Sequence, residues 1–279
     1  MILFTHHNEW SKLLESYVSN RGSVGYVPTM GALHDGHASL IERAAQENEI
    51  CVMSIFVNPT QFNEESDLVA YPKTLTEDLI IAEKAGCDFV FAPQAESFYN
   101  GRIESTSVDY GTLTSSLEGA HRPGHFDGVA TVVRMLLNAI NPHRAYFGEK
   151  DFQQLAIIRE MVKREQIPTK IVGCDLIRDK DGLALSSRNV RLSPKGRQNA
   201  LAISQTLFQL QPKVEHSDPK LLSNWGMRHL EQQPGIEMEY FSIVDAETLA
   251  PATSWNRPTR ALVACWVEGV RLIDNIALS

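Results

Sequence analysis

Apolar and polar positions along the first two thirds of the chain follow two different periods. Residues 24–28 and 49–57 are short apolar runs rich in β-branched side chains, a pattern typical of buried strands. Residues 37–48, 74–86 and 127–140 instead repeat their apolar positions at helical spacing. Further strands are predicted at 87–93, 144–148 and 169–178, and a further helix at 152–165. This alternation predicts a mainly parallel sheet covered by helices on both faces.

The pattern changes after about residue 175. Two helical segments, 193–210 and 219–233, are followed by strand-like segments at 237–245 and 260–275 with no helix between them. The predicted fold class is therefore α/β: a Rossmann-like doubly wound parallel sheet in residues 1–175, with a second, smaller α+β domain in residues 176–279. Ligands of such a sheet bind at the carboxyl ends of its strands.

Composition restricts the partners and the compartment. The 279 residues carry a formal net charge of −8, so the surface repels nucleic acid and membranes, and an anionic ligand needs a local group of donors. No apolar run reaches the roughly eighteen residues of a membrane span, and residues 1–18 lack a leader pattern. The four cysteines, Cys51, Cys87, Cys174 and Cys265, are widely spaced and mostly lie in or beside apolar runs. They indicate buried thiols in a reducing cytoplasm.

The first candidate chemistry is the stretch "YVPTMGALHDGH" at residues 26–37. His34 and His37 follow a predicted strand and open a helix, where the helix dipole and unpaired backbone N–H groups favour an anion. Gly31 and Gly36 allow a ligand to approach the backbone closely. A helix-entry turn with two exposed histidines is the plainer alternative, and zinc would require further ligands that are not near in sequence.

Three other strand ends carry polar side chains that chemistry can use. Asn58 and Gln61 follow the second strand, Lys150, Asp151 and Gln154 lie between a strand and a helix, and Ser186, Ser187 and Arg188 follow the last strand of the first domain. Each group can also be explained as a turn or a helix cap. Together they would surround one crevice of a doubly wound sheet, which favours a binding site.

Five blocks of the sequence resemble the successive motifs of the pantoate–β-alanine ligase family. They are "VPTMGALHDGH" (27–37), "SIFVNPTQF" (54–62), "RPGHFDGV" (122–129), "FGEKDFQQ" (147–154) and "DGLALSSRN" (181–189), and the closing "RLIDN" (271–275) is also similar. The HxGH motif by itself is shared by the nucleotidylyltransferases and class I aminoacyl-tRNA synthetases. The five blocks together, in the family's order and spacing, are specific.

The resemblance implies an ATP-dependent carbon–nitrogen ligase that condenses pantoate with β-alanine to give pantothenate. Pantoyl adenylate would be the intermediate, and AMP and pyrophosphate the products. It also implies a homodimer formed through the first domain. ATP would be a substrate, accompanied by Mg²⁺ on its β and γ phosphates.

The resemblance also assigns site residues. The positions that match the family's ATP-binding residues are Met30, Gly31, Ala32, Leu33, His34, Asp35, Gly36, His37, Gly148, Glu149, Lys150, Asp151, Ile177, Leu185, Ser186, Ser187 and Arg188. Those expected to take part in catalysis are His37, His34, Lys150, Ser186, Ser187 and Arg188. Gln61 matches a residue that binds pantoate and β-alanine, Asn58 the asparagine beside it, and Gln154 a second pantoate contact.

Two parts of the chemistry have no assigned residue. Asp78 is a candidate ligand of Mg²⁺, although its place in a predicted helix favours a solvated acid on the helix face. No dedicated base for the β-alanine ammonium stands out. His121 and His125 lie in a glycine-rich stretch that suggests a loop over the site, with or without a catalytic role.

Two alternative functions remain open. A nucleotidyltransferase of the same superfamily would also use HxGH, but a phosphate acceptor favours Arg or Lys where this chain has Gln61 and Gln154. A nucleotide-binding protein without catalysis is the second alternative. A tRNA synthetase is disfavoured by the acidic charge and by the lack of a large basic domain.

Overall fold

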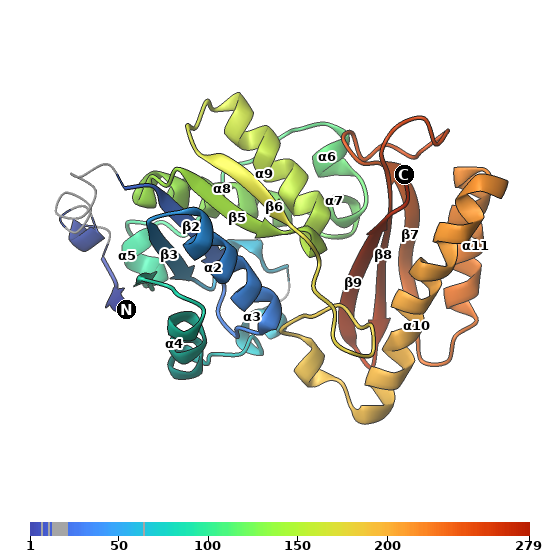
Figure 1. Ribbon diagram of the computed structural model, residues 1–279, viewed down its shortest axis with the longest axis horizontal. Helices are drawn as coiled ribbons and strands as arrows, with labels where there is room; N and C mark the ends of the chain where they lie inside the picture. The colour runs from blue at the N-terminus through green and yellow to red at the C-terminus, as the bar shows by residue number, and fades with distance from the viewer. Residues whose placement is uncertain (7, 11, 13–21, 64) are drawn as a thin grey trace. The chain divides into compact units, whose positions relative to one another are not determined.

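The computed structural model describes residues 1–6, 8–10, 12, 22–63 and 65–279 (Figure 1). The chain divides into a first unit, Met1–Glu149 with Gln154–Asp175, and a second unit, Lys150–Gln153 with Leu176–Ser279. The stretch 1–18, in which no leader pattern was expected, lies partly outside the described residues. No helix in the described ranges combines the length and the apolar character needed to cross a membrane.

The described part of the first unit is built on a six-stranded parallel sheet with the order β1-β4-β3-β2-β5-β6. Its strands are β1 (Ile2–Phe4), β2 (Val24–Thr29), β3 (Ile50–Ile55), β4 (Phe89–Phe91), β5 (Arg144–Gly148) and β6 (Lys170–Cys174). Its helices are α2 (Asp35–Glu47), α3 (Glu65–Val69), α4 (Leu75–Lys84), α5 (Ala95–Phe98), α6 (Thr112–Ser115), α7 (Glu118–His121), α8 (His125–Ile140) and α9 (Phe152–Arg164), with 3-10 turns η2 (Pro59–Gln61) and η3 (Glu149–Asp151). The predicted doubly wound sheet is confirmed.

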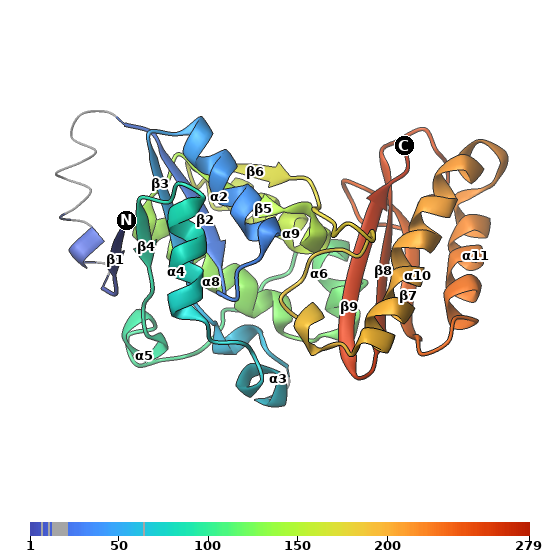
Figure 2. The same cartoon turned by 60° about the horizontal axis from the view of Figure 1, so that its bottom comes forward.

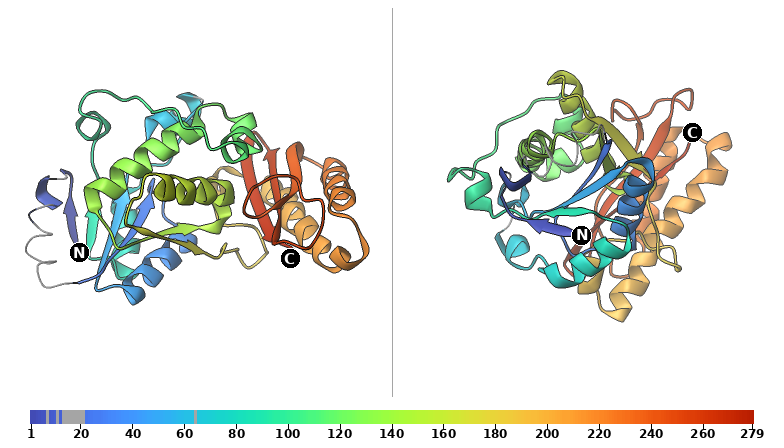
Figure 3. Two further views of the ribbon diagram at one scale, coloured as in Figure 1. Left: turned by 90° about the horizontal axis from the view of Figure 1, so that it is seen from above. Right: turned by 60° about the vertical axis from the view of Figure 1, so that its left-hand side comes forward.

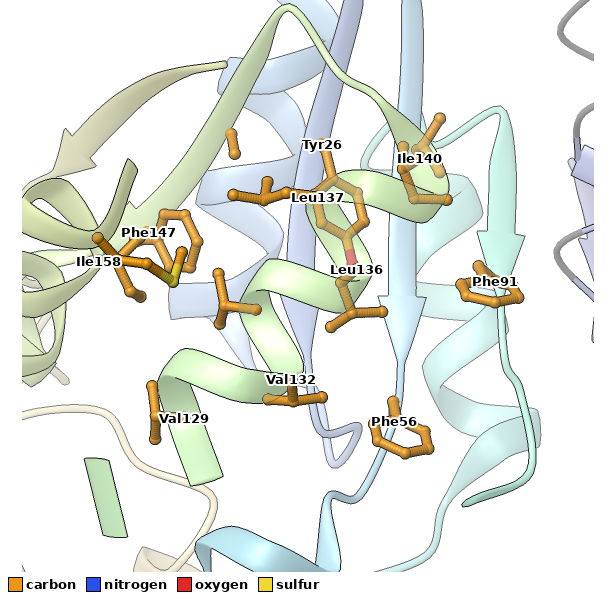
Figure 4. Packing of buried hydrophobic residues seen from close by; sticks show 14 of the residues in the cluster. Tyr26, Phe56, Phe91, Val129, Val132, Leu136, Leu137, Ile140, Phe147 and Ile158 are labelled. Atoms are coloured by element: carbon orange, nitrogen blue, oxygen red, sulfur yellow. The ribbon is translucent and has the colours of Figure 1, made fainter. Parts of the chain in front are cut away.

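Successive residues of each strand face opposite sides of the sheet, so each strand supplies two cores. Tyr26 and Phe147 pack with α8 and α9, while Val27 and Tyr146 pack with α2 and α4. Figure 4 shows Tyr26 and Phe147 in the first of these cores, beside Leu136 and Leu137 of α8. In the view from above, the green and olive helices α8 and α9 lie on one side of the sheet and the blue helix α2 on the other (Figure 3, left).

The second unit is an antiparallel sheet covered on one face by two helices (Figures 1 and 2). Its elements are η4 (Asn189–Arg191), α10 (Pro194–Leu210), η5 (Gln211–His216), α11 (Pro219–Glu231), β7 (Glu237–Asp245), β8 (Thr259–Val267) and β9 (Val270–Ala277). Apolar residues of α10 and α11 pack on the inner face of β7, β8 and β9 to form its core. The smaller α+β unit predicted by the change of pattern is therefore present.

The four cysteines are buried and form no disulfide, as expected from their apolar surroundings. Burial raises the pKa of Cys174, and it raises the pKa of Cys265 to about 12. These thiols therefore stay protonated and act as small core residues.

Candidate active site

The strand order of the parallel sheet reverses at β2. The chain reaches β3 on one side of β2 through α2 and β5 on the other side from α8, and these helices pack on opposite faces. Ligands of doubly wound sheets bind outside the carboxyl ends of the strands at such a reversal. In the first unit, Met30–His37 follows β2, while Gly148 is the last residue of β5 and Glu149 follows it. Apart from Gly148 itself and its two chain neighbours, the described residues place no heavy atom within 4 Å of the point where a Cβ on Gly148 would stand, so the backbone there is open to a ligand.

The segment Met30–His37, which we call the histidine turn, has an unusual backbone. Gly31 and Ala32 have φ angles of 77° and 51°, in the left-handed region that favours glycine. The Thr29 hydroxyl accepts a hydrogen bond from the Gly31 N–H at 3.2 Å and donates to the Ser54 carbonyl at 2.7 Å. The end of β2 is thereby tied to β3 at the point where the turn begins.

Asp78 holds the middle of the histidine turn. Its carboxylate accepts the N–H groups of Ala32 at 3.0 Å and Leu33 at 2.8 Å, and it also accepts the Thr74 hydroxyl at 3.2 Å. The Asp78 residue is 1% exposed, so the expectation of a solvated acid on a helix face is wrong. The carboxylate oxygens are already used by the turn, which argues against Asp78 as a Mg²⁺ ligand.

We expect Asp78→Ala to lower the free energy of unfolding by about 2–4 kcal/mol, because two buried N–H donors lose their acceptor. Urea denaturation measures this difference. Glu77→Ala is the matched control, since Glu77 is exposed one position earlier in the same helix. Equal midpoints for the two variants would show that the turn does not depend on Asp78.

His34 and His37 form a reciprocal cap at the start of α2. His34 is the N-cap residue, and its Nδ1 accepts the Gly36 N–H at 3.2 Å, while His37 Nδ1 accepts the His34 N–H at 3.3 Å. The ring centroids are 4.1 Å apart. Because both Nδ1 atoms accept, the neutral rings carry their proton on Nε2. The first-turn N–H groups expected to be unpaired are partly used within the turn, so an anion would be attracted mainly by Nε2–H and the helix dipole.

Asn58 opens the second group, which we call the glutamine turn (Asn58–Gln61). Its Nδ2 donates to the Gly128 carbonyl at 3.1 Å and to Gln61 Oε1 at 3.3 Å, and its Oδ1 accepts the Tyr99 hydroxyl at 2.7 Å. Burial raises the pKa of Tyr99, so this hydroxyl remains a donor. Asn58 is 1% exposed. Its amide is therefore occupied by protein partners.

Gln61 connects the two turns. Its side-chain nitrogen contacts the sulfur of Met30, so the glutamine turn adjoins the first residue of the histidine turn. His125 is the first residue of α8 rather than part of a loop, and its Nδ1 lies 2.7 Å from the Gln61 carbonyl. His121 is exposed at the end of α7. Gln154 lies half-buried in the first turn of α9, and Asp35 is exposed at the start of α2.

The predicted residues Ile177 and Leu185–Arg188 of the second unit lie on a hairpin and the turn that follows it. An antiparallel bridge joins Arg178 to Ala184, and the Leu185 N–H donates to the Ile177 carbonyl at 3.1 Å. Ile177 and Leu185, both expected at the nucleotide, are thus brought together. The predicted strand 169–178 ends early, at Cys174, because residues 176–178 belong to this second unit.

The turn after this hairpin, Leu185–Asn189, is closed on itself. Ser186 accepts the Arg188 N–H on its hydroxyl at 3.3 Å, and the Asn189 side chain donates to the Ala184 carbonyl at 2.9 Å. Asn189 Oδ1 is buried, with no hydrogen-bond partner in the described structure. Sequence reasoning missed Asn189 because its bonds lie within the turn and leave no periodic pattern.

Lys150 is held through its backbone. Its carbonyl accepts the Asn275 side chain at 2.9 Å, and its ammonium lies 3.7 Å from the Asp151 carboxylate. Asn275 itself is 3% exposed and accepts Arg260 at 2.6 Å. The backbone of Lys150 is therefore fixed independently of its side chain. Asn275 lies in the closing block "RLIDN".

A doubly wound sheet with polar turns at its reversal point places the chain among the Rossmann-like α/β proteins, whose ligands bind at this edge. Within that class, the chain belongs to the pantoate-beta-alanine ligase family, whose model matches residues 2–277. The family expected from the five sequence blocks is confirmed, and with it a ligase that forms pantothenate from pantoate and β-alanine.

Sequence relatives and solved structures agree with this family. A pantothenate synthetase of Bacteroides fragilis is 51% identical over 256 residues, which are 91% of this chain and 90% of the relative. One of Flavobacterium psychrophilum is 43% identical over the full length of both chains. The pantothenate synthetase of Thermus thermophilus superposes with a TM-score of 0.93 at 40% identity, covering 100% of this chain and 99% of that one.

A further solved structure carries ligands. The pantoate-beta-alanine ligase of Francisella tularensis, complexed with Beta-gamma ATP and β-alanine, superposes with a TM-score of 0.83 at 35% identity. The match covers 99% of this chain and 97% of that one.

Proposed function

We propose that the chain activates pantoate with ATP and then joins it to β-alanine. A pantoate carboxylate oxygen attacks the α-phosphorus, and the bond to the pyrophosphate oxygen breaks, leaving pantoyl adenylate. The β-alanine nitrogen then attacks the acyl carbon, the acyl–phosphate bond breaks, AMP leaves, and the amine loses a proton to give pantothenate. The observation that carries this proposal is the contact of Gln61 with Met30, which joins a turn suited to anions to a neutral amide turn.

The histidine turn is proposed to hold the phosphates of ATP. His34 and His37 both use Nδ1 for the helix cap, so the ring N–H that we propose as the phosphate donor is on Nε2. Charge builds on the phosphoryl oxygens during attack, and fixed donors stabilise it without rearrangement. Gly148 and Glu149, at the end of β5, are proposed to contact the same nucleotide, where the open backbone of Gly148 leaves room.

The family match extends the proposal to the second unit. Lys150, Ser186, Ser187 and Arg188 are proposed as donors to the phosphates, with Asp151 beside them. Ile177 and Leu185 are proposed to contact the nucleotide next to these donors, Ile177 through its backbone. Lysine, arginine and hydroxyl donors suit the negative charge that passes to the leaving pyrophosphate.

Gln61 and Gln154 are proposed to bind pantoate. Asn58 is assigned a positioning role instead of a direct contact, because its amide is buried and bonded to Gly128, Gln61 and Tyr99. His125 is not proposed as the base for β-alanine, because both of its ring nitrogens have protein partners.

Mg²⁺ is proposed to enter with ATP as part of the substrate. The described residues contain no group of three or more His, Cys, Asp or Glu side chains arranged to hold a metal ion. Mg²⁺ keeps most of its waters and binds phosphate oxygens with few protein ligands, so it does not require a metal site built from several side chains. It would neutralise charge on the β and γ phosphates. A homodimer and a cytoplasmic location remain proposals that rest on the family resemblance and on the reduced thiols.

The test combines the protein with Mg-ATP, pantoate and β-alanine and identifies the nucleotide released. AMP with pyrophosphate is the expected result. ADP would exclude the adenylate mechanism, and incorporation of AMP into a stable product would indicate a nucleotidyltransferase. No release at all would favour a binding protein without catalysis. Omitting β-alanine separates the first step, since pyrophosphate should still appear in an amount close to one equivalent of enzyme.

Gln61→Glu is expected to raise the KM for pantoate at least ~10-fold while leaving the KM for ATP nearly unchanged, because a carboxylate would face the carboxylate of pantoate. Gln94→Glu is the control, since it adds the same charge at a position of the first unit outside the two turns. Steady-state kinetics with each substrate varied in turn measures the difference. If only the KM for ATP rises, Gln61 does not bind pantoate and has been assigned to the wrong substrate.

A further inference from the structure

We propose that His125 is a positioning residue that fixes the backbone of Gln61 and thereby the direction of its side-chain amide. This inference rests on the proposed role of Gln61 in binding pantoate. It concerns residues of the first unit, and it assigns a function to the block "RPGHFDGV" that the nucleotide and pantoate contacts leave unexplained.

The protonation of the His125 ring follows from its two partners. Nδ1 lies 2.7 Å from the Gln61 carbonyl, which can only accept, so Nδ1 carries a proton. Nε2 lies 3.1 Å from an Arg122 nitrogen, which can only donate, so Nε2 has no proton. His125 is therefore a neutral imidazole with a fixed tautomer. At 8% exposure the ring is largely shielded from water, which strengthens both bonds.

Arg122 supports this ring from the other side. It forms an ion pair with the Glu118 carboxylate at 3.7 Å, and Glu118 is 7% exposed. Arg122 also reaches the Gln61 carbonyl at 3.5 Å. The positively charged Arg122 guanidinium donates to Nε2 and leaves the ring proton on Nδ1, where it bonds the Gln61 carbonyl. Glu118 balances that charge, so these three side chains together carry no net charge that would repel an anionic substrate.

The glutamine turn is held against α8 on a second side. A Cβ on Gly128 would stand 2.4 Å from the Thr60 carbonyl oxygen and 2.7 Å from the Gln61 nitrogen, so the two backbones are in direct contact. Asn58 bonds both the Gly128 carbonyl and Gln61 Oε1. His125 holds the carbonyl of Gln61, Asn58 holds its Oε1, and one side-chain N–H contacts the Met30 sulfur, so Gln61 presents the second N–H of its NH₂ group. An NH₂ group is the donor that a carboxylate or hydroxyl oxygen of pantoate requires.

Two variants of His125 separate positioning from general stability. His125→Asn places an amide NH₂ near the position of Nδ1 and can still donate to the Gln61 carbonyl. His125→Gln places its amide near Nε2, keeping an acceptor for Arg122 but losing the donor to Gln61. We expect His125→Gln to lower kcat/KM for pantoate about 10-fold or more, since small displacements of a binding group have effects of this size. His125→Asn should recover most of that loss, and the KM for ATP should change less than about two-fold in both.

Controls make the result specific. Asp127→Asn alters the same first turn of α8, where Asp127 accepts the Val108 N–H at 2.8 Å, away from Gln61. It should lower the melting temperature without changing the KM for pantoate. His125→Ala is measured beside His125→Gln, so that the comparison does not depend on one variant folding. An equal fall in kcat/KM for pantoate in His125→Asn and His125→Gln would overturn the positioning role. So would a change confined to the KM for ATP. A parent protein that releases no pyrophosphate would instead refute the proposed function itself.

Discussion

Lys150→Ala is expected to slow the formation of pantoyl adenylate by about 100-fold or more, the scale seen when one fixed donor to developing charge is removed. The fold should survive, because the Lys150 backbone is held by Asn275 through its carbonyl and not through the side chain. The ammonium makes a 3.7 Å ion pair with Asp151, and this pair is 20% and 48% exposed, so its loss costs little stability. Single-turnover release of pyrophosphate measures the chemical step.

Lys163→Ala provides the control for this variant. Lys163 is exposed in the last turn of α9, so its replacement removes the same charge far along the helix from the sheet edge. It should leave the rate within about two-fold of the parent. Lys150→Arg keeps the charge but changes its shape, and an intermediate rate would show that position matters as well as charge. A Lys150→Ala rate close to that of the parent would remove Lys150 from the mechanism.

The parallel sheet could be predicted because its central strands, β2 and β3, are buried on both faces. Residues 24–28 and 49–57 are apolar at nearly every position, and the structure places them side by side in parallel as β2 and β3. Local composition was enough to predict these two strands because apolar helix faces cover both sides of the sheet. The edge strand β1, Ile2–Phe4, was not predicted because the polar residues 5–9 follow its three apolar residues at once. The equally short β4 lies within the longer, mainly apolar segment 87–93.

The supporting residues of the site could not be predicted, because their partners are distant in sequence. Asp78 bonds a turn 45 and 46 residues earlier, and His125 bonds Gln61, 64 residues earlier. Within its own helix, Asp78 is simply one of the two acidic residues in the first turn of α4. The signal that could have identified it is the left-handed turn at Gly31 and Ala32, whose N–H groups need an acceptor once they are buried.

The candidate ligand-binding residues were easier to place than their supports. His34 and His37 lie between a strand and a helix, and that context is visible in the periodicity of residues 24–48. What the sequence did not reveal is that the two histidines cap the helix themselves. The cap determines which nitrogen of each ring carries the proton, and the role proposed for His37 depends on that nitrogen.

His37 has two proposed roles, as part of the helix cap and as a donor to phosphate, and a pair of variants can separate them. His37→Ala removes both the acceptor for the His34 N–H and the Nε2–H donor. His37→Gln supplies a residue that commonly completes a cap at this helix position, so it should keep the start of α2 while removing the imidazole. A difference in stability or activity between the two variants measures the effect of the cap. A loss of activity that both variants share measures the effect of the imidazole ring. His121→Ala is the control, since that histidine is exposed.

Both His37 variants are expected to slow pyrophosphate release about 100- to 1000-fold, because a donor that matters most when charge grows on the α-phosphoryl group acts on the transition state. ATP affinity should fall much less, since ground-state phosphate keeps its other donors. Melting temperature should fall for His37→Ala and recover in His37→Gln, because the helix cap is restored. Pre-steady-state pyrophosphate release, ATP binding and thermal denaturation measure these three quantities. If the loss lies wholly in ATP affinity for both variants, His37 holds the ground-state nucleotide and contributes nothing specific to the reaction.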